Sequence, residues 1–305
     1  MRESPMAFVD RIASAPISWG ICEVPGWGQM LPTDRVLSEM TGLGLRATEY
    51  GAPGFLPTEA SGIRSVLDGH GMSLLGGFTP LVLHDPARRE QATAYARSVA
   101  ELLGAAGATT FVSCPVMDDD WSVPRTLTRE EHQHLVRMLG VVDTICDEHG
   151  LTQVLHPHVQ TVVETSPDVE RVLESCDVNW CLDTGHLAIG GTDPVDFARR
   201  AADRVGHVHL KDVRMDLVPA LMDRSTSIME GVQAGLFPPL GQGDLPLGDV
   251  VRELEQAGYQ GWYVIEQDTA ITGAMPEPGE GPVRGVEESL RYLHEVVAPS
   301  LEPSA

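Results

Sequence analysis

The feature of this sequence that most constrains its fold is a strict alternation of short apolar runs with longer amphipathic stretches, repeated eight times. This pattern is typical of buried parallel strands connected by helices. Strands are predicted at residues 12–18, 46–50, 72–78, 109–114, 153–156, 179–182, 205–210 and 262–265. Helices are predicted at 34–42, 59–69, 86–103 and 129–149, from 166, from 193, and at 248–257 and 285–296. Eight such pairs predict an α/β fold, a (β/α)8 TIM barrel, rather than a doubly wound sheet.

The 305 residues are predicted to form one barrel domain with its core at about 11–296. Two insertions, 214–247 and 270–283, follow the seventh and eighth strands. Loops that follow strands build the active-site face of such barrels, so both insertions are predicted to lie on that face. No GxGxxG or GxxxxGK[ST] run occurs, so the sequence gives no support for a dinucleotide or P-loop site.

The formal net charge of -23 argues against binding to nucleic acid or to an anionic membrane. The sequence shows no apolar stretch of membrane-spanning length and no signal-peptide pattern, so a cytoplasmic protein is expected. The five cysteines are odd in number and lack metal-type spacing, which predicts reduced and mostly buried thiols. The sequence does not indicate whether the protein forms a homo-oligomer.

Lys211 is the only lysine, and it follows two alternating histidines in the run His-Val-His-Leu-Lys-Asp at 207–212. A compact ammonium differs from a guanidinium in both geometry and pKa. Lys211 is therefore a candidate catalytic and substrate-binding residue. The alternative is that a coding bias towards arginine left one lysine on a solvated strand end.

Polar side chains recur at the ends of the last four predicted strands: His156, His158, Asp183, His186, His207, His209, Lys211 and Glu266. Side chains alternate along a strand, so His207 and His209 share one face, and His209, nearer the strand end, is the better ligand. Imidazoles and carboxylates together suit a divalent ion such as Mn, Co, Zn or Fe. The pattern therefore predicts a metal site, with hydrogen-bonded structural residues as the alternative.

A divalent ion among these groups would polarise a ketone and make the neighbouring C–H more acidic. His158 or His186 could then move the proton, because imidazole titrates near neutral pH. Lys211 could hold its charge on a substrate oxygen or act as an acid. Glu49, after the second strand, is predicted to accept a hydrogen bond from a substrate hydroxyl, and the alternative is an ion pair with a rim arginine.

Aromatic side chains follow the ends of the first four strands: Trp19, Trp27, Phe55, Phe78 and Trp121. They are predicted to form an apolar wall that excludes water and packs against a sugar ring, with Trp19 as a substrate contact. Ordinary packing is the alternative.

Four runs at strand ends resemble successive signatures of the xylose-isomerase-like sugar isomerase/epimerase superfamily: Asp-Thr-Gly-His (183–186), His-Val-His-Leu-Lys-Asp (207–212), Pro-Leu-Gly-Gln-Gly-Asp (239–244) and Gly-Trp-Tyr-Val-Ile-Glu (261–266). Three further runs are most similar to the inosose dehydratase branch: Ala-Pro-Ile-Ser-Trp-Gly (15–20), Thr-Glu-Tyr-Gly (48–51) and His-Pro-His (156–158). The resemblance covers roughly residues 11–295.

The resemblance implies one divalent ion, Mn or Co first and Zn, Fe or Mg otherwise, held by His156, Asp183, His209 and Glu266. It also implies that His186 contacts the substrate. Many epimerases of the superfamily carry a glutamate where this chain has His156 and use it with the last-strand glutamate as an acid/base pair. That pair is broken here, and His156 is left as either a ligand or an acid/base group.

These observations predict a metal-dependent lyase acting on a polyhydroxy ketone, a keto-cyclitol such as 2-keto-myo-inositol. His158, His186, Lys211 and Glu266 are the expected catalytic residues. A keto-sugar isomerase or epimerase with the same metal site is one alternative, and a sugar-binding barrel without turnover is another. A phosphatase or nuclease would need more carboxylate ligands and a basic groove.

Overall fold

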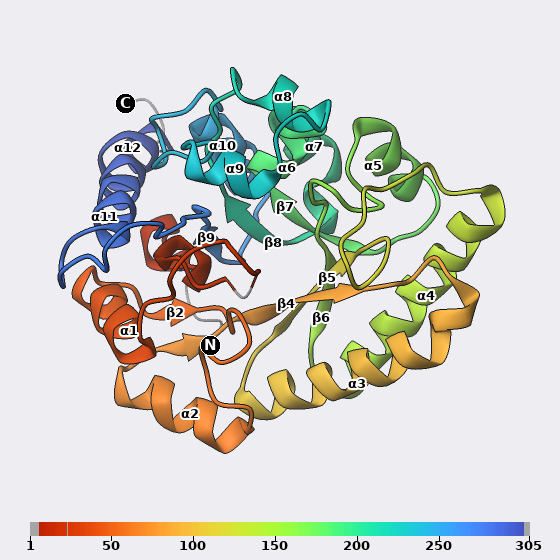
Figure 1. Cartoon of the computed structure of the whole chain (residues 1–305), viewed down its shortest axis with the longest axis horizontal. Coiled ribbons are helices and arrows are strands. Elements are labelled where there is room, and N and C mark those ends of the chain that lie inside the picture. Colours follow the sequence, from red (N-terminus) through yellow and green to blue (C-terminus); the bar gives the residue numbers. More distant parts are fainter. Residues whose placement is uncertain (1–5, 23, 302–305) are drawn as a thin grey trace.

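The computed structural model describes residues 6–22 and 24–301, which form a barrel of parallel strands surrounded by helices (Figure 1). The strands are β1 (Ile12–Ser14), β2 (Ala47–Thr48), β3 (Ser73–Leu74), β4 (Gly76–Leu81), β5 (Thr110–Pro115), β6 (Thr152–Leu155), β7 (Asn179–Asp183), β8 (Val205–Leu210) and β9 (Tyr263–Ile265). They pair in the order β3-β2-β1-β9-β8-β7-β6-β5-β4. The predicted TIM barrel is confirmed.

The helices lie between the strands in the sequence, as the alternation predicts. They are α1 (Thr33–Gly42), α2 (Ala60–Gly69), α3 (Arg89–Ala106), α4 (Arg129–Glu148), α5 (Ser166–Leu173), α6 (Thr184–Ile189), α7 (Pro194–Ala201), α8 (Val218–Met222), α9 (Ile228–Gln233), α10 (Leu247–Gln256), α11 (Pro282–Tyr292) and α12 (Ala298–Leu301). No helix within the described residues is long and apolar enough to cross a membrane.

β3 and β4 are two parts of one barrel strand, separated only by Leu75. β3 pairs with β2 and β4 pairs with β5. Leu75 joins both neighbours, because its N–H donates to Thr48 O at 2.9 Å and its carbonyl accepts from Thr110 N at 3.0 Å. A Cβ at Gly76 would lie 2.5 Å from Thr110 O, so glycine allows the close approach at which the strand changes partner. The nine segments therefore make eight barrel strands.

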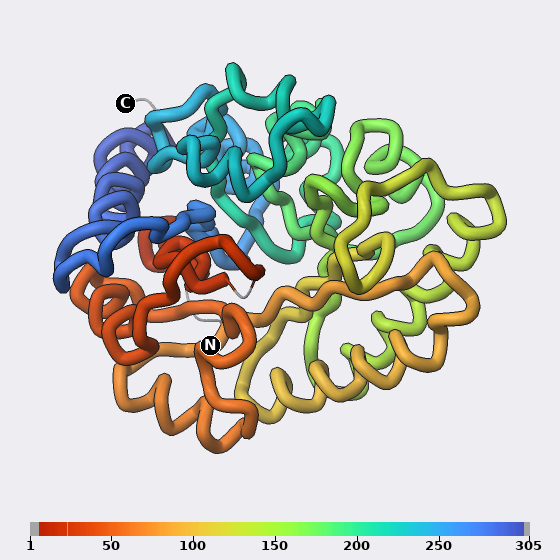
Figure 2. Tube along the Cα trace, viewed as in Figure 1, coloured from red at the N-terminus to blue at the C-terminus, as the bar shows by residue number. Residues whose placement is uncertain are grey.

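The first and last strands close the barrel: β1 and β9 pair in parallel from Ile12 with Tyr263 to Ser14 with Ile265. Figure 2 shows the red N-terminal and blue C-terminal segments side by side. Because all strands run in parallel, their carboxyl ends lie on one face of the barrel.

Outward-facing strand residues pack against the helices in the largest apolar cluster, which includes Phe111, Leu155, Leu182 and Val208. The barrel interior holds smaller apolar side chains: Ala13, Ala47 and Val264 in one cluster, and Val112, Val154 and Cys181 in another. Alternation along each strand separates the two layers. On β8 it turns His207 and His209 inward, while Val208 and Leu210 join the outer layer.

Two local elements differ from the sequence-based expectation. The first strand ends at Ser14, and a 3-10 helix, Pro16–Trp19, follows it. The short helix α6 was not predicted, and it starts directly after β7. It begins there because Asp183 Oδ1 accepts a hydrogen bond from His186 N at 2.7 Å, which caps the helix.

The insertion at 214–247 carries α8 and α9 and packs through a small apolar cluster of its own. The cluster joins Val218, Leu221 and Leu236 of the insertion to Val159 after β6. Just before the insertion, the Asp212 carboxylate accepts backbone N–H bonds from residues 241, 243 and 245 at 2.8–3.1 Å. The run at 239–244 thus closes around Asp212 and fixes where the insertion returns to the barrel.

Candidate functional site

Four neighbouring strands, β6 to β9, end in polar side chains that the fold brings together. His156 follows β6, Asp183 ends β7, His209 lies near the end of β8, and Glu266 follows β9. The β7–β8 register places Asp183 directly beside His209. His156, Asp183 and His209 are buried, whereas the Glu266 side chain is 12% exposed. The structure therefore gathers all four predicted ligands, and Glu266 is the member of the set that solvent or substrate can reach.

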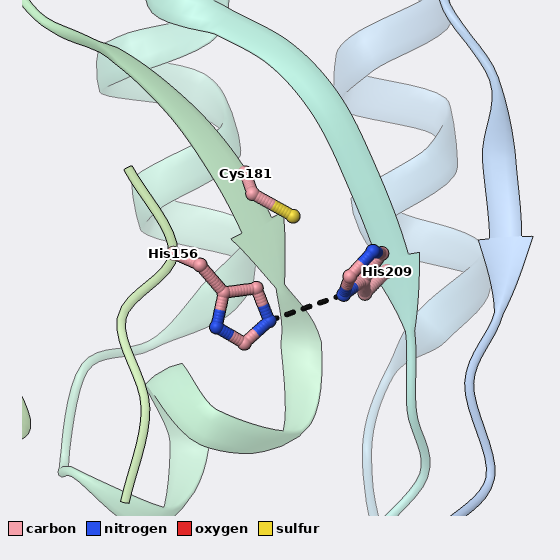
Figure 3. A group of neighbouring side chains, drawn as sticks. All are labelled: His156, Cys181 and His209. Atoms are coloured by element: carbon pink, nitrogen blue, oxygen red, sulfur yellow. Dashed lines mark hydrogen bonds between the residues drawn. The ribbon is translucent and has the colours of Figure 1, made fainter. Parts of the chain in front are cut away.

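The donor atoms of this cluster converge. His209 Nδ1 lies 3.1 Å from His156 Nε2 and 2.6 Å from Glu266 Oε2. Asp183 Oδ2 lies 3.4 Å from His156 Nε2 and 3.8 Å from His209 Nδ1. Figure 3 shows the two imidazoles facing each other, with Cys181 on the strand between them. Burial raises the pKa of Cys181 to about 11, so this residue stays a neutral thiol at physiological pH.

The Asp183 carboxylate shows that the cluster fits a divalent ion. Its Oδ1 caps α6, but its Oδ2 is buried and has no hydrogen-bond partner. A buried carboxylate oxygen without a hydrogen bond is costly unless cations compensate it, and the Lys211 ammonium, 3.7 Å from Oδ2, lies beyond hydrogen-bond distance. Atoms bound to one divalent ion at about 2.0–2.2 Å lie roughly 3–4 Å apart, as Asp183 Oδ2 does from both imidazole nitrogens. Two imidazoles and two carboxylates also form a suitable donor set.

Glu49 reaches into the barrel from the end of β2 and accepts hydrogen bonds from two histidines. Its Oε1 lies 2.8 Å from His207 Nε2 and 2.9 Å from His209 Nε2. Burial on its own raises the pKa of Glu49, but the two imidazoles lower it to about 2. With its Nε2–H bonded to Glu49, His209 directs Nδ1 at the cluster, as ligating histidines commonly do. Glu49 Oε1 therefore binds two imidazoles inside the barrel, and the predicted contact with a substrate hydroxyl stays a prediction.

Lys211 follows β8, and its ammonium is buried beside the cluster. Nζ donates to Glu266 Oε1 at 2.8 Å and to Asp268 Oδ1 at 2.9 Å, and lies 3.1 Å from His186 Nε2. Burial alone lowers the pKa of Lys211, but the carboxylates of Asp268 and Glu266 raise it above its ordinary value. Lys211 is therefore a fixed positive charge rather than a residue on a solvated strand end.

His158 and His186 lie against each other next to the cluster, with ring centroids 3.9 Å apart and ring planes tilted by 37°. His158 Nδ1 donates to Val159 O at 2.6 Å, so Nε2 is its acceptor nitrogen. Burial, with His156 and Lys211 nearby, lowers the pKa of His158 to about 3. Burial and His158 also lower the pKa of His186 well below its usual value. Both rings are therefore neutral at physiological pH.

Phe78 and Trp121 supply an apolar surface beside these histidines. Their rings stack at 6.2 Å, and Trp121 meets His158 edge-on at 5.5 Å. Phe78 also meets His156 edge-on at 5.6 Å, and 40% of it remains exposed. The predicted aromatic wall thus has two members that lie at the site.

Trp19, Trp27 and Phe55 are buried in packing instead. Trp19 Nε1 donates to Glu39 Oε2 on α1 at 2.9 Å, which turns the indole away from the strand ends and into the helix layer. Trp27 Nε1 donates to Thr269 O at 2.8 Å. The prediction of Trp19 as a substrate contact is corrected, because the 3-10 helix after β1 rotates its side chain outward.

Three residues at the site were not found from the sequence. Asp268 holds Lys211, and burial raises its pKa to about 6 against the opposing effect of that lysine. Its position two residues after Glu266 was an available signal. Phe237, from the insertion, lies 4.8 Å from Lys211 Nζ and shields it. A Cβ at Gly185 would lie 2.8 Å from Lys211 Cγ and Cδ, so this glycine leaves room for the lysine stem.

The sequence of this chain is similar to those of known proteins over most of its length. The chain is 34% identical over 275 residues to an inosose dehydratase of Geobacillus kaustophilus, which covers 86% of this chain and 89% of that protein. It is 31% identical over 282 residues to the rhizopine catabolism protein MocC of Rhizobium meliloti, covering 87% and 84%.

Solved structures share the fold at low sequence identity. An L-ribulose 3-epimerase superposes with a TM-score of 0.68 at 15% identity, over 97% of this chain and 96% of that one. A D-allulose 3-epimerase from Methylomonas sp., solved with D-allulose, gives 0.66 at 15% identity, over 96% and 99%. The family model described as "Xylose isomerase-like TIM barrel" matches residues 38–296. The chain therefore belongs to the xylose isomerase-like TIM barrel family.

Proposed function

We propose that this protein is a metal-dependent lyase that removes water from a keto-cyclitol such as 2-keto-myo-inositol. One observation carries the proposal. The residue that follows β6 and joins Glu266 in the cluster is a histidine, His156, rather than a carboxylate. Because His156 directs Nε2 at Asp183 and His209, it serves as a ligand. Only Glu266 then remains of the two acid/base groups that a simple epimerisation needs. The identity to inosose dehydratases over most of the chain supports the same substrate class.

His156, Asp183, His209 and Glu266 would hold the ion, for which we propose Mn²⁺ or Co²⁺. A bound divalent ion polarises the ketone oxygen and stabilises the negative charge that develops there. Glu49 fixes the orientation of His209 from behind, and Lys211 adds a permanent positive charge on the substrate side.

The neutral imidazole of His158 takes the proton from the carbon next to the ketone, and His186 lies against it at 3.9 Å. The electron pair of that C–H bond forms a C=C bond while the β-hydroxyl leaves. The proton held by this histidine pair passes to the hydroxyl, so that water departs. Lys211, held by Asp268 and Glu266, donates a hydrogen bond to a substrate oxygen, and Phe78 and Trp121 pack against the C–H face of the ring.

We also propose that residues 1–305 act as one barrel domain in the cytoplasm, on a small molecule rather than on nucleic acid or a membrane. The net charge of -23 argues against nucleic acid and anionic membranes as partners, because the surface would repel phosphate groups.

The test incubates metal-loaded protein with 2-keto-myo-inositol, and with ketohexoses and ketopentoses in parallel, in deuterated solvent. We expect a product from the cyclitol that has lost one water, detected by mass and by the absorbance of the enolised dione. His158→Ala and His186→Ala should each slow turnover about 10²- to 10⁴-fold if they transfer protons. If ketohexoses or ketopentoses exchange label and epimerise while the cyclitol loses no water, the protein is an isomerase. If no sugar reacts, the lyase proposal is equally wrong.

A further inference from the structure

Three loops on the active-site face share an unusual backbone feature. Among the described residues, the only non-glycine residues with left-handed φ are Trp121 (55°), Gln160 (66°) and Arg224 (65°). They lie after β5, after β6 and in the insertion after β8. Side chains rarely adopt this conformation, and residues that do so tend to gather where function requires a defined geometry.

Hydrogen bonds connect these three residues through Glu164. Arg224 Nη2 donates to Glu164 Oε2 at 2.5 Å. Glu164 Oε1 accepts from Gln160 N at 2.6 Å, and Gln160 Nε2 donates to Trp121 O at 2.8 Å. Glu164 is buried, so its pairing with Arg224 is shielded from solvent. We call these four residues the loop-linking network.

The two ends of the network belong to the two sides of the proposed substrate pocket. At one end, the Trp121 ring stacks on Phe78 and meets His158 edge-on. At the other end, Arg224 follows α8, whose Leu221 packs in the apolar cluster of the insertion. The network therefore connects the insertion to the aromatic wall.

Packing alone does not fix Trp121. Its side chain also lines a cavity of about 230 Å³, together with Arg88, Tyr95 and Asp118. The indole therefore has open volume beside it as well as the site in front of it. Two hydrogen bonds hold the backbone of Trp121: its N–H donates to Asp118 O at 3.3 Å, and its carbonyl accepts from Gln160 Nε2 at 2.8 Å.

We propose that Gln160, Glu164 and Arg224 are positioning residues that couple docking of the insertion to the placement of Trp121 against His158. With the insertion docked, Trp121 and Phe78 form the wall that receives the substrate ring. With the network broken, Trp121 moves towards the neighbouring cavity and the wall opens. The effect on catalysis rests on the proposed keto-cyclitol dehydration, whereas the coupling itself does not.

The first variant is Gln160→Gly. Glycine adopts left-handed φ without strain, so the variant should melt at the same temperature as the wild type or higher. It loses the bond to Trp121 O, and we expect KM for the cyclitol to rise about tenfold while kcat changes by less than about twofold. A side chain with a merely structural role would give the opposite pattern, a lower melting temperature with unchanged KM, and that result would overturn the proposal.

The second test measures amide hydrogen exchange without substrate. Arg224→Ala should accelerate exchange in residues 117–124 about tenfold, because the far end of the network is released. Arg200→Ala is the matched control: Arg200 also forms a 2.5 Å pair with a glutamate, Glu170, but between outer helices. The control should leave exchange at 117–124 unchanged.

Equal exchange at 117–124 in wild type and Arg224→Ala would refute the coupling, whatever the kinetics show. If the wild type does not dehydrate the cyclitol, the proposed function fails, and the exchange result alone decides the coupling.

Discussion

The carboxyl ends of β6 to β9 and those of β1 to β5 lie on one face of the same barrel but carry different chemistry. The β6–β9 half ends in His156, Asp183, His209 and Glu266. Donor atoms of His156, Asp183 and His209 lie 3.1–3.8 Å apart, and Glu266 Oε2 lies 2.6 Å from His209 Nδ1. In the described part of the chain, the β1–β5 half carries no such cluster at its strand ends apart from Glu49, and its Phe78, within β4, is 40% exposed. One half can bind a cation and the polar groups of a substrate, and the other can cover its apolar face.

Glu49 is the exception that makes this comparison informative. It directly follows β2, yet its carboxylate crosses the barrel to His207 and His209. The charged half is therefore not self-sufficient. The imidazoles of His207 and His209 are oriented by a residue from the other half. The hydrogen-bond partners of a polar residue inside a barrel therefore have to be sought on strands on the opposite side as well as on adjacent ones.

The largest effect should come from removing one charge in the charged half. Asp183→Asn keeps an oxygen to cap α6 but loses the negative charge that would hold the ion. We expect no bound metal by elemental analysis and a loss of turnover of at least about 10³-fold, more than residues behind the ligands typically cause. Asp193→Asn, at the N-cap of α7, is the matched control and should keep both. Full metal occupancy in Asp183→Asn would remove this residue from the ligand set.

Lys211→Arg should have the next largest effect, a fall in kcat/KM of about 10²-fold with metal content unchanged. The planar guanidinium cannot place a single nitrogen between Glu266 and Asp268, and the path beside Gly185 is narrow. Lys211→Met, which removes the charge and keeps a linear side chain, should lose at least as much. Unchanged kinetics in the arginine variant would show that position is unimportant and that charge alone suffices.

Glu49→Gln tests the link between the two halves. The amide oxygen of glutamine can take the place of Oε1, which accepts both histidine bonds, but it lacks the negative charge that keeps the two imidazoles basic. We expect metal affinity, measured by titrating metal-free protein, to fall about 10- to 100-fold. Glu39→Gln is the control, because Glu39 also accepts from an aromatic N–H, that of Trp19, but in the helix layer. Equal affinities in the two variants would mean that Glu49 does not orient His209.

The sequence predicts the barrel and the gathering of polar strand ends because both follow from local patterns. Apolar alternation predicts β8 at 205–210, where the structure has it, and places His209 inward. Parallel strands then bring their carboxyl ends to one face without any knowledge of contacts. This is why His156, Asp183, His209, Lys211 and Glu266 could be named in advance.

The parts that sequence analysis missed depend on contacts between distant residues. The role of Glu49 requires a partner 158 residues away in the chain. Trp19 follows strand β1, so it was expected to face the site. The 3-10 helix after β1 instead turns its side chain towards Glu39. α6 is short and contains Gly185, so it has no helical periodicity to detect, and its start depends on the cap from Asp183.

The smallest effect should come from the apolar half, where two phenylalanines separate packing from binding. Phe78 is 40% exposed and Phe55 is 5% exposed. Phe78→Ala removes surface that a substrate ring would cover but few core contacts, so KM should rise several-fold to about tenfold with little change in unfolding free energy. Phe55→Ala should instead lower the unfolding free energy by about 3–5 kcal/mol, measured in denaturant, and leave KM unchanged where the protein is folded. If Phe78→Ala lowers stability as much as Phe55→Ala and leaves KM unchanged, the apolar half is only core, and the division of the face into a charged side and a ring-binding side is wrong.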